Sequence, residues 1–84
     1  MNEKMRRRRE LRREFLLRLY ERVDASVSEF VDAHEIAAAL GIDDDETRRM
    51  FEYLEEKGWI LVDDHRAAVI RLTAAGVDAA EAES

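Results

Sequence analysis

Hydrophobic residues in the first quarter of the chain recur at spacings of three and four positions. These residues are Leu11, Phe15, Leu16, Leu19, Tyr20 and Val23. This is the period of one buried helical face, and no glycine or proline interrupts the segment from Glu3 to about Ala25, so we predict a long amphipathic first helix. Its opening turns, up to Arg9, offer only Met1 and Met5 as apolar residues, so the arginines there are expected to project beyond the core or fray.

Two shorter helices with marked ends are predicted after a connection at residues 26–31. Asp32 and Asp43 each stand three positions before a glutamate, which is the spacing of an N-terminal capping box. Gly41 and Gly58 close the two patterns and are typical helix-ending residues. The inward residues of the third helix are then Thr47, Met50, Phe51 and Leu54. Two helices joined by a tight, glycine-containing turn predict a helix-turn-helix.

Beyond the third helix the pattern changes to two short apolar runs, at residues 59–62 and 68–72, around four polar residues. Such runs predict a β-hairpin, and the lack of Asn-Gly or Asp-Gly at its tip predicts a longer or looser turn. Thr73 is then placed to cap a short final helix, which Gly76 weakens. The tail at residues 80–84 is expected to fray.

The aromatic residues fit the same arrangement. We expect Phe15, Phe30 and Phe51 in the core, and Trp59 to pack the first strand of the hairpin against the helices. The two tyrosines are expected to be half exposed.

Composition restricts the class of protein. The 84 residues include no cysteine and no proline, which excludes a disulfide scaffold and a cysteine-based zinc site and favours one small domain. The net charge of −6 argues against a surface that binds nucleic acid or anionic lipid throughout. The charge is unevenly distributed, however, because residues 1–22 hold nine Lys and Arg against four Glu, whereas residues 23–84 hold five basic and sixteen acidic residues.

Several functions find little support in the residues. The longest apolar run, at residues 36–40, is far too short for a membrane span, and no signal peptide is indicated, so we expect a soluble cytoplasmic protein with no membrane partner. His34 and His65 stand far apart, without a glycine-rich phosphate loop or a Ser–His–Asp set. We therefore expect no enzyme, no cofactor and no metal.

Four phrases of the sequence, with the predicted order of elements, resemble a known family. They are LYERV at residues 19–23, VDAHEIAAALGI at 31–42, YLEEKGWI at 53–60 and IRLTAAGVDAAE at 70–81. These look like the winged helix-turn-helix domains of prokaryotic transcriptional regulators, broadly the MarR and PadR kind. The resemblance implies a mainly α fold with a small β-hairpin: a three-helix core, a two-stranded wing and a short C-terminal helix. The domain then spans residues 11–82, after a basic helical extension at residues 1–10.

The resemblance also implies a way of meeting double-stranded DNA. A recognition helix at about residues 44–57 enters the major groove, and a wing at about residues 59–72 lies on the flanking backbone. The candidate DNA-binding residues are Arg48, Arg49, Tyr53, Arg66, Arg71, Arg8 and Arg12. Guanidinium groups on the recognition helix contact phosphates or guanine edges, and Arg66 matches by position the wing cation that enters the minor groove. The arginine cluster of the first helix would add salt-sensitive phosphate contacts, and its members are Arg6, Arg7, Arg8, Arg9, Arg12 and Arg13.

Each of these cations also has a simpler interpretation. Arg48 and Arg49 can pair with carboxylates one helical turn away on a solvated face. Arg66 can be a solvated turn residue, and Arg71 points to the outer face of the hairpin, where it supports a backbone contact or keeps that face soluble. The arginine cluster can equally pair with an acidic surface, either its own or that of a partner.

Three explanations of the charge therefore stay open. The first is a DNA-binding regulator, which is expected to be a homodimer. The dimer interface can be the first helix, which has surplus apolar residues such as Leu17, or the alanine-rich last helix, and we favour the first helix. The alternative is a protein–protein interaction module whose acidic face does not bind DNA, as the acidic run at residues 43–46 suggests. Third, acidity with twelve Arg against two Lys can reflect a salt-loving or high-GC host.

Overall fold

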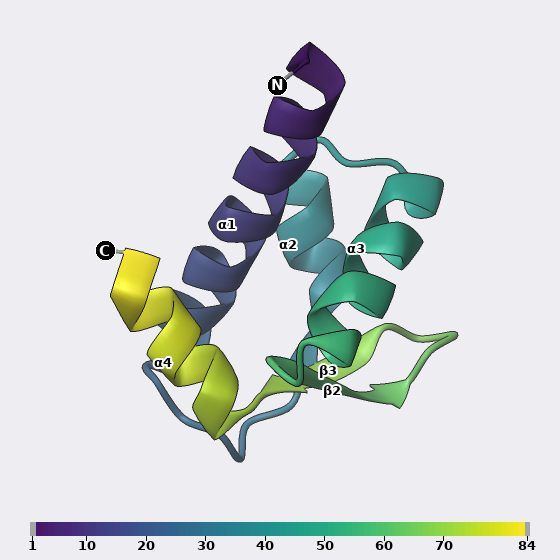
Figure 1. The fold of residues 1–84 in the computed structure, drawn as a ribbon. Coiled ribbons are helices and arrows are strands. Elements are labelled where there is room, and N and C mark those ends of the chain that lie inside the picture. Colours follow the sequence, from purple (N-terminus) through teal and green to yellow (C-terminus); the bar gives the residue numbers. More distant parts are fainter. Residues whose placement is uncertain (1, 84) are drawn as a thin grey trace.

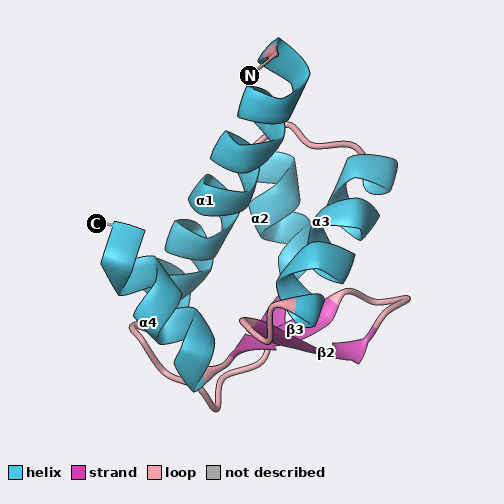
Figure 2. Cartoon of the chain, in the orientation of Figure 1, coloured by secondary structure: helices cyan, strands magenta, loops and turns pink. Residues whose placement is uncertain are grey.

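The computed structural model describes residues 2–83, which form a mainly helical chain with a small antiparallel sheet (Figure 1). In chain order the elements are α1 (Glu3–Val23), β1 (Val31–Asp32), α2 (Ala33–Ala39), α3 (Asp44–Glu56), β2 (Ile60–Asp64), β3 (Val69–Leu72) and α4 (Ala74–Glu83). Figure 2 shows α1, α2 and α3 on one side of the sheet, and α4 packs against α1. The expected fold class is confirmed at this level.

α1 is continuous through the arginine cluster. The helix begins after Asn2, whose side chain accepts a hydrogen bond from the backbone N–H of Met5 at 2.9 Å. The expected basic helical extension is the exposed first part of α1, while Met1 lies outside the described residues. Arg7 reaches α3, where its guanidinium lies 3.0 Å from the carboxylate of Glu46. The extension thus contacts the helix predicted to read DNA.

The predicted helix ends are confirmed. The side chains of Asp32 and Asp43 each accept a hydrogen bond from a backbone N–H in the first turn, of α2 and α3 respectively, at 2.9 and 2.8 Å. The Oγ1 of Thr73 does the same for α4 at 3.0 Å. Gly41 and Gly58, with φ of 69° and 75°, take the left-handed conformation that ends a helix with little steric cost.

The sheet has one strand more than expected. Val31 and Asp32 form β1, which pairs with β3 and gives the strand order β1-β3-β2, so the sheet extends by one strand beyond the predicted two-stranded hairpin. A two-residue strand has no alternation that a sequence pattern could reveal. The β2–β3 hairpin is confirmed, and its turn spans residues 65–68. The carboxylate of Asp64 holds this loose turn by accepting from two of its backbone N–H groups at 3.0 and 3.1 Å.

The core lies between the sheet and the first three helices. Its largest fully buried side chains are Phe15, Leu19, Leu54, Ile60, Ile70 and Leu72. The rings of Phe15 and Phe51, with centroids 5.6 Å apart, join α1 to α3. The predicted inward stripe of α3 is confirmed, Thr47 included. Leu17, named as a surplus apolar residue of the first helix, is partly buried against the core, and the expected dimer interface stays a prediction.

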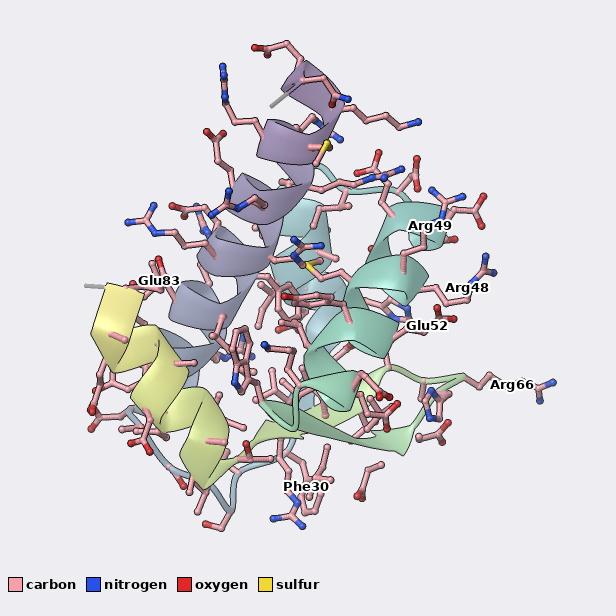
Figure 3. The ribbon with its side chains drawn as sticks, in the orientation of Figure 1. Phe30, Arg48, Arg49, Glu52, Arg66 and Glu83 are labelled. Carbon is pink, nitrogen blue, oxygen red and sulfur yellow. The ribbon has the colours of Figure 1, made fainter. Side chains whose placement is uncertain are left out.

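Phe30 corrects the predicted core, because its side chain is 54% exposed. The next residue, Val31, is buried, and since successive side chains of an extended segment point to opposite faces, Phe30 faces outward. Its ring lies on the side of the sheet away from α3 (Figure 3), where the guanidinium of Arg71 stands 6.0 Å from the ring centroid.

α4 is held more firmly than its alanines suggested. The helix extends to Glu83, whose carboxylate pairs with Arg13 of α1 at 3.0 Å, so the predicted fraying of residues 80–83 is wrong, while residue 84 lies outside the described residues. Gly76 is buried, and a Cβ there would overlap the carbonyl oxygen of Trp59. Gly76 therefore permits close packing and is not simply a weak point of the helix.

A second link between α1 and α4 should make stability depend on alkaline pH. The hydroxyl of Tyr20 donates to the carboxylate of Glu81 at 2.8 Å, and this hydrogen bond, with desolvation and the negative charges of Glu81 and Asp24, raises the pKa of Tyr20 above its ordinary value of 10.0. The protonated tyrosine is the form that is stabilised on folding. This contribution is therefore complete below pH 10 and is lost as the pH rises through the raised pKa.

We expect the free energy of unfolding to fall above pH 10 and the fall to be smaller in Tyr20→Phe. Urea unfolding across an alkaline pH series measures both. Tyr53→Phe is the control, because the Tyr53 hydroxyl makes no hydrogen bond within residues 2–83. If the free energy of unfolding fell equally steeply above pH 10 in the wild type and in Tyr20→Phe, the proposed contribution of Tyr20 would be contradicted.

Candidate nucleic-acid interface

Three arginines project from one side of the molecule. Arg48 and Arg49 leave α3 away from the core, and Arg66 extends from the tip of the β2–β3 hairpin toward the same side (Figure 3). α3 orients its arginines in this way because Thr47 and Met50, on either side of them, occupy its buried face. Arg48 and Arg66 line a groove of about 420 Å³, here named the α3–hairpin groove.

Carboxylates outnumber the arginines in the α3–hairpin groove. Asp44, Asp45 and Glu52 line it beside Arg48 and Arg66. Arg48 lies 3.5 Å from Asp45, in an ion pair whose two side chains are about two-thirds exposed or more, so the pair adds little stability and opens readily. Arg66 makes no ion pair within residues 2–83. This face therefore offers cations to a ligand while surrounding them with negative charge.

A second set of predicted residues, which shares Arg49 with the first, meets between α1 and α3. Arg8, Arg12 and Arg49 surround a small pocket of about 60 Å³, named the α1–α3 pocket. Its apolar floor consists of Leu11, Ile42 and Met50. Arg8 and Arg12 are four positions apart and so share one face of α1. Glu46, the one carboxylate lining the pocket, is neutralised by Arg7 at 3.0 Å.

Aromatic side chains extend this cationic region toward α4. The guanidinium of Arg12 lies 4.0 Å from the ring centroid of Tyr53, and Tyr53 meets Trp59 edge-on at 6.4 Å. These three residues, with Arg9 and Arg13, line a groove of about 300 Å³, named the α1–α4 groove.

Sequence reasoning identified Tyr53 and the arginine cluster, including Arg9, Arg12 and Arg13, but missed Trp59, which was expected only to pack the hairpin against the helices. No local signal connects Trp59 to α1, because the two segments meet only in the fold.

Arg71 is not brought together with the other candidates. Its guanidinium donates to the carbonyl oxygen of Val27 at 3.2 Å and lies over the ring of Phe30. Its Nε is buried without a hydrogen-bond partner in the structure. The outward orientation predicted for Arg71 is confirmed, but here the side chain fastens the loop before β1. Its predicted place in a common site with Arg48 and Arg66 is therefore corrected.

Other chemistry has few groups to draw on within residues 2–83. No three histidine, cysteine or carboxylate side chains are grouped to hold a metal ion there, and none of the helices is both long and apolar enough to cross a membrane. His34 and His65 are exposed, at 3.6 Å from Asp32 and 3.9 Å from Glu55 respectively. Comparison with protein families, curated proteins and solved structures finds no match for this chain.

Proposed function

We propose that this chain is a winged-helix protein that binds double-stranded DNA as a transcriptional regulator. The observation that carries the proposal is the common orientation of Arg48 and Arg49 on α3 and Arg66 on the hairpin tip (Figure 3). α2 and α3 are joined by a short turn containing Gly41, as in a helix-turn-helix, and the hairpin follows α3 directly. In this arrangement α3 enters the major groove and the hairpin lies along the neighbouring backbone.

The two arginines of α3 have different freedom to contact DNA. Arg49 makes no ion pair within residues 2–83, whereas Arg48 must leave Asp45. Both stand in the first half of α3, the part of a recognition helix that reaches base edges, where a guanidinium can bind O6 and N7 of guanine together. Arg66, on the turn of the hairpin, is suited to a phosphate or to the minor groove.

The carboxylates around these arginines limit the affinity. Asp44 and Asp45 form the acidic first turn of α3, which stabilises the helix through its dipole but repels phosphate. We therefore expect sequence-independent binding to be weak, with a dissociation constant above about 1 μM at moderate salt. Specific binding then requires two copies on a two-fold operator, which is the reason to propose a homodimer.

Titration of a labelled mixed-sequence duplex at about 50 and about 200 mM salt tests the proposal. We expect Arg66→Gln and Arg49→Gln each to weaken binding and to lower the slope of log affinity against log salt by about 0.9, because on a mixed-sequence duplex, which has no operator to read, each arginine contacts a phosphate. Arg18→Gln is the matched control, since Arg18 is exposed on α1 beside Glu21 and Arg22, away from α3. Absence of binding at the lower salt would end the proposal.

A second candidate function rests on the same carboxylates. Asp44, Asp45 and Glu52 line a groove that a basic protein surface could fill, and the chain would then be a protein–protein interaction module. Co-purification from the native host tests it: a stable basic partner supports this function. Recovery of DNA without a protein partner would contradict it.

A further inference from the structure

The α1–α4 groove differs in chemistry from the α3–hairpin groove. Arginines and aromatic rings line it, namely Arg9, Arg12, Arg13, Tyr53 and Trp59, and Glu83 is its one carboxylate. We propose that this groove binds single-stranded nucleic acid. The site goes beyond the proposed duplex-binding function, because it uses a different groove and a different property of the ligand, the open faces of unpaired bases.

Charge complementarity is the first argument. Arg12 has no carboxylate within ion-pairing distance among the described residues, so its charge is available to a phosphate. Arg13 pairs with Glu83, but both side chains are about half exposed, and a phosphate can replace an exposed carboxylate at little cost. Such a concentration of cations in a chain of net charge −6 marks the groove as the place where a polyanion would bind.

The cationic track continues beyond the groove. Arg12 also lines the α1–α3 pocket, together with Arg8 and Arg49. A ligand that leaves the α1–α4 groove over Arg12 therefore meets two further guanidinium groups, that of Arg8 on α1 and that of Arg49 on α3. This continuity favours an extended polyanion over a small anion, because successive phosphates of one strand can follow the helix.

The aromatic residues decide between a single strand and a duplex. Arg12 stacks on Tyr53 at 4.0 Å, and Tyr53, which is 38% exposed, stands edge-on to Trp59. Bases stack on aromatic rings and on guanidinium planes. In a duplex the base faces are hidden by neighbouring base pairs, so a duplex could use only the arginines. An unpaired base can stack on the aromatic rings while its phosphate binds the arginines. The groove therefore suits a single strand better than a duplex.

The size and walls of the groove agree with one inserted base. Its volume of about 300 Å³ lies at the lower end of ligand sites in proteins. Ala79 and Ala82 of α4 form the wall opposite α1, and their small side chains leave room beside the aromatic rings. The hydrogen bond from Tyr20 of α1 to Glu81 of α4 holds that wall in place.

Titration with a fluorescein-labelled oligothymidylate of about 12 nucleotides tests the proposal at low salt. We expect saturable binding by anisotropy and, with unlabelled oligonucleotide, quenching of the protein emission. Trp59 is the one tryptophan of the chain, so this emission reports on the groove directly. A duplex of equal length is expected to leave the emission nearly unchanged, since it does not stack on the rings.

Two variants and two controls locate the site. Tyr53→Leu removes the stacking surface and is expected to weaken oligothymidylate binding by roughly 5- to 150-fold. Arg12→Gln is expected to weaken it and to reduce the salt slope by about 0.7. Arg18→Gln removes the same charge from another face of α1, and Arg66→Gln removes it from the hairpin, so both should bind as the wild type does. Thermal unfolding of each variant checks that the fold is intact.

The outcomes separate this proposal from duplex binding. Three results would overturn the single-strand site. They are the absence of saturable oligothymidylate binding, binding without a change in Trp59 emission, and an equal loss of binding affinity in Arg12→Gln and Arg18→Gln. An equally strong emission change with poly-glutamate would also overturn it, because the groove would then accept any polyanion. If Arg66→Gln loses duplex binding while its oligothymidylate binding is unchanged, the result supports both sites. If the wild-type protein binds the oligonucleotide but no duplex, the result contradicts only the proposed function.

Discussion

Phe15→Ala is expected to destabilise the protein by about 3–5 kcal/mol. The Phe15 side chain is completely buried, and its ring packs against Phe51 with centroids 5.6 Å apart. Truncation removes the transfer free energy of the ring and leaves a cavity between α1 and α3 that the surrounding side chains fill only in part. A domain of this length has roughly 4–13 kcal/mol of total stability, so this one change can remove most of it. Urea unfolding followed by circular dichroism measures the loss.

Phe30→Ala is the matched control, since it deletes the same ring at an exposed position. Phe30 is 54% exposed and contacts the guanidinium of Arg71 at 6.0 Å, so its removal should cost about 1 kcal/mol at most. Similar losses in the two variants would contradict the assignment of Phe15 to the core and Phe30 to the outer face of the sheet.

The features predicted correctly are those with local causes. The ends of α3 are defined by neighbouring residues alone. Asp43 binds a backbone N–H of the first turn, three positions later, and Gly58 takes the left-handed conformation at the end of the helix. The period of the apolar positions gives the buried face of α3 in the same way, including Met50 and Leu54. These signals need no knowledge of what lies across the core.

The features predicted wrongly depend on partners distant in the sequence. β1 exists because Val31 pairs with Ile70, and two residues carry no pattern of their own. The end of α4 packs against α1, where Arg13, seventy positions earlier in the chain, pairs with Glu83. Phe30 was assigned to the core by residue type, although the burial of Val31 beside it decides its orientation.

The candidate site was likewise predicted only as far as local sequence signals allowed. The sequence supplied the arginines, but only the fold sorts them into the α3–hairpin groove with Arg48 and Arg66, the α1–α3 pocket with Arg8, and the outer face of the sheet with Arg71. The stack of Arg12 on Tyr53 joins residues forty-one positions apart, so no spacing could indicate it.

This sorting changes what the net charge of −6 implies. The α3–hairpin groove has more carboxylates than arginines, whereas five arginines and two glutamates line the α1–α3 pocket and the α1–α4 groove together. Binding of any nucleic acid should therefore be more sensitive to salt when it uses α1 than when it uses the hairpin. The acidic remainder of the surface would direct a polyanion toward α1 by repelling it elsewhere.

Gly76→Ala is expected to destabilise the protein by about 2–3 kcal/mol, although alanine is the better helix former by about 1 kcal/mol. Gly76 lies in the first turn of α4, where the added Cβ would overlap the carbonyl oxygen of Trp59 and crowd Leu72. The carbonyl cannot rotate away as a flexible side chain would, because it also accepts a hydrogen bond from the N–H of Thr73 at 3.1 Å. α4 must therefore shift outward and lose part of its packing on α1.

Ala75→Gly separates packing from helix propensity at the neighbouring, exposed position of α4. It should cost only the propensity difference of about 1 kcal/mol and leave the position of α4 unchanged. Gly76→Ala should lower the free energy of unfolding by more than Ala75→Gly does. It should also alter the emission of Trp59, because the crowded carbonyl belongs to Trp59 and because Ala79 and Ala82 of α4 line the same groove. Weaker oligothymidylate binding would accompany the shift. If Gly76→Ala were as stable as the wild type, the close approach of α4 to Trp59 would be wrong, and with it the geometry of the α1–α4 groove.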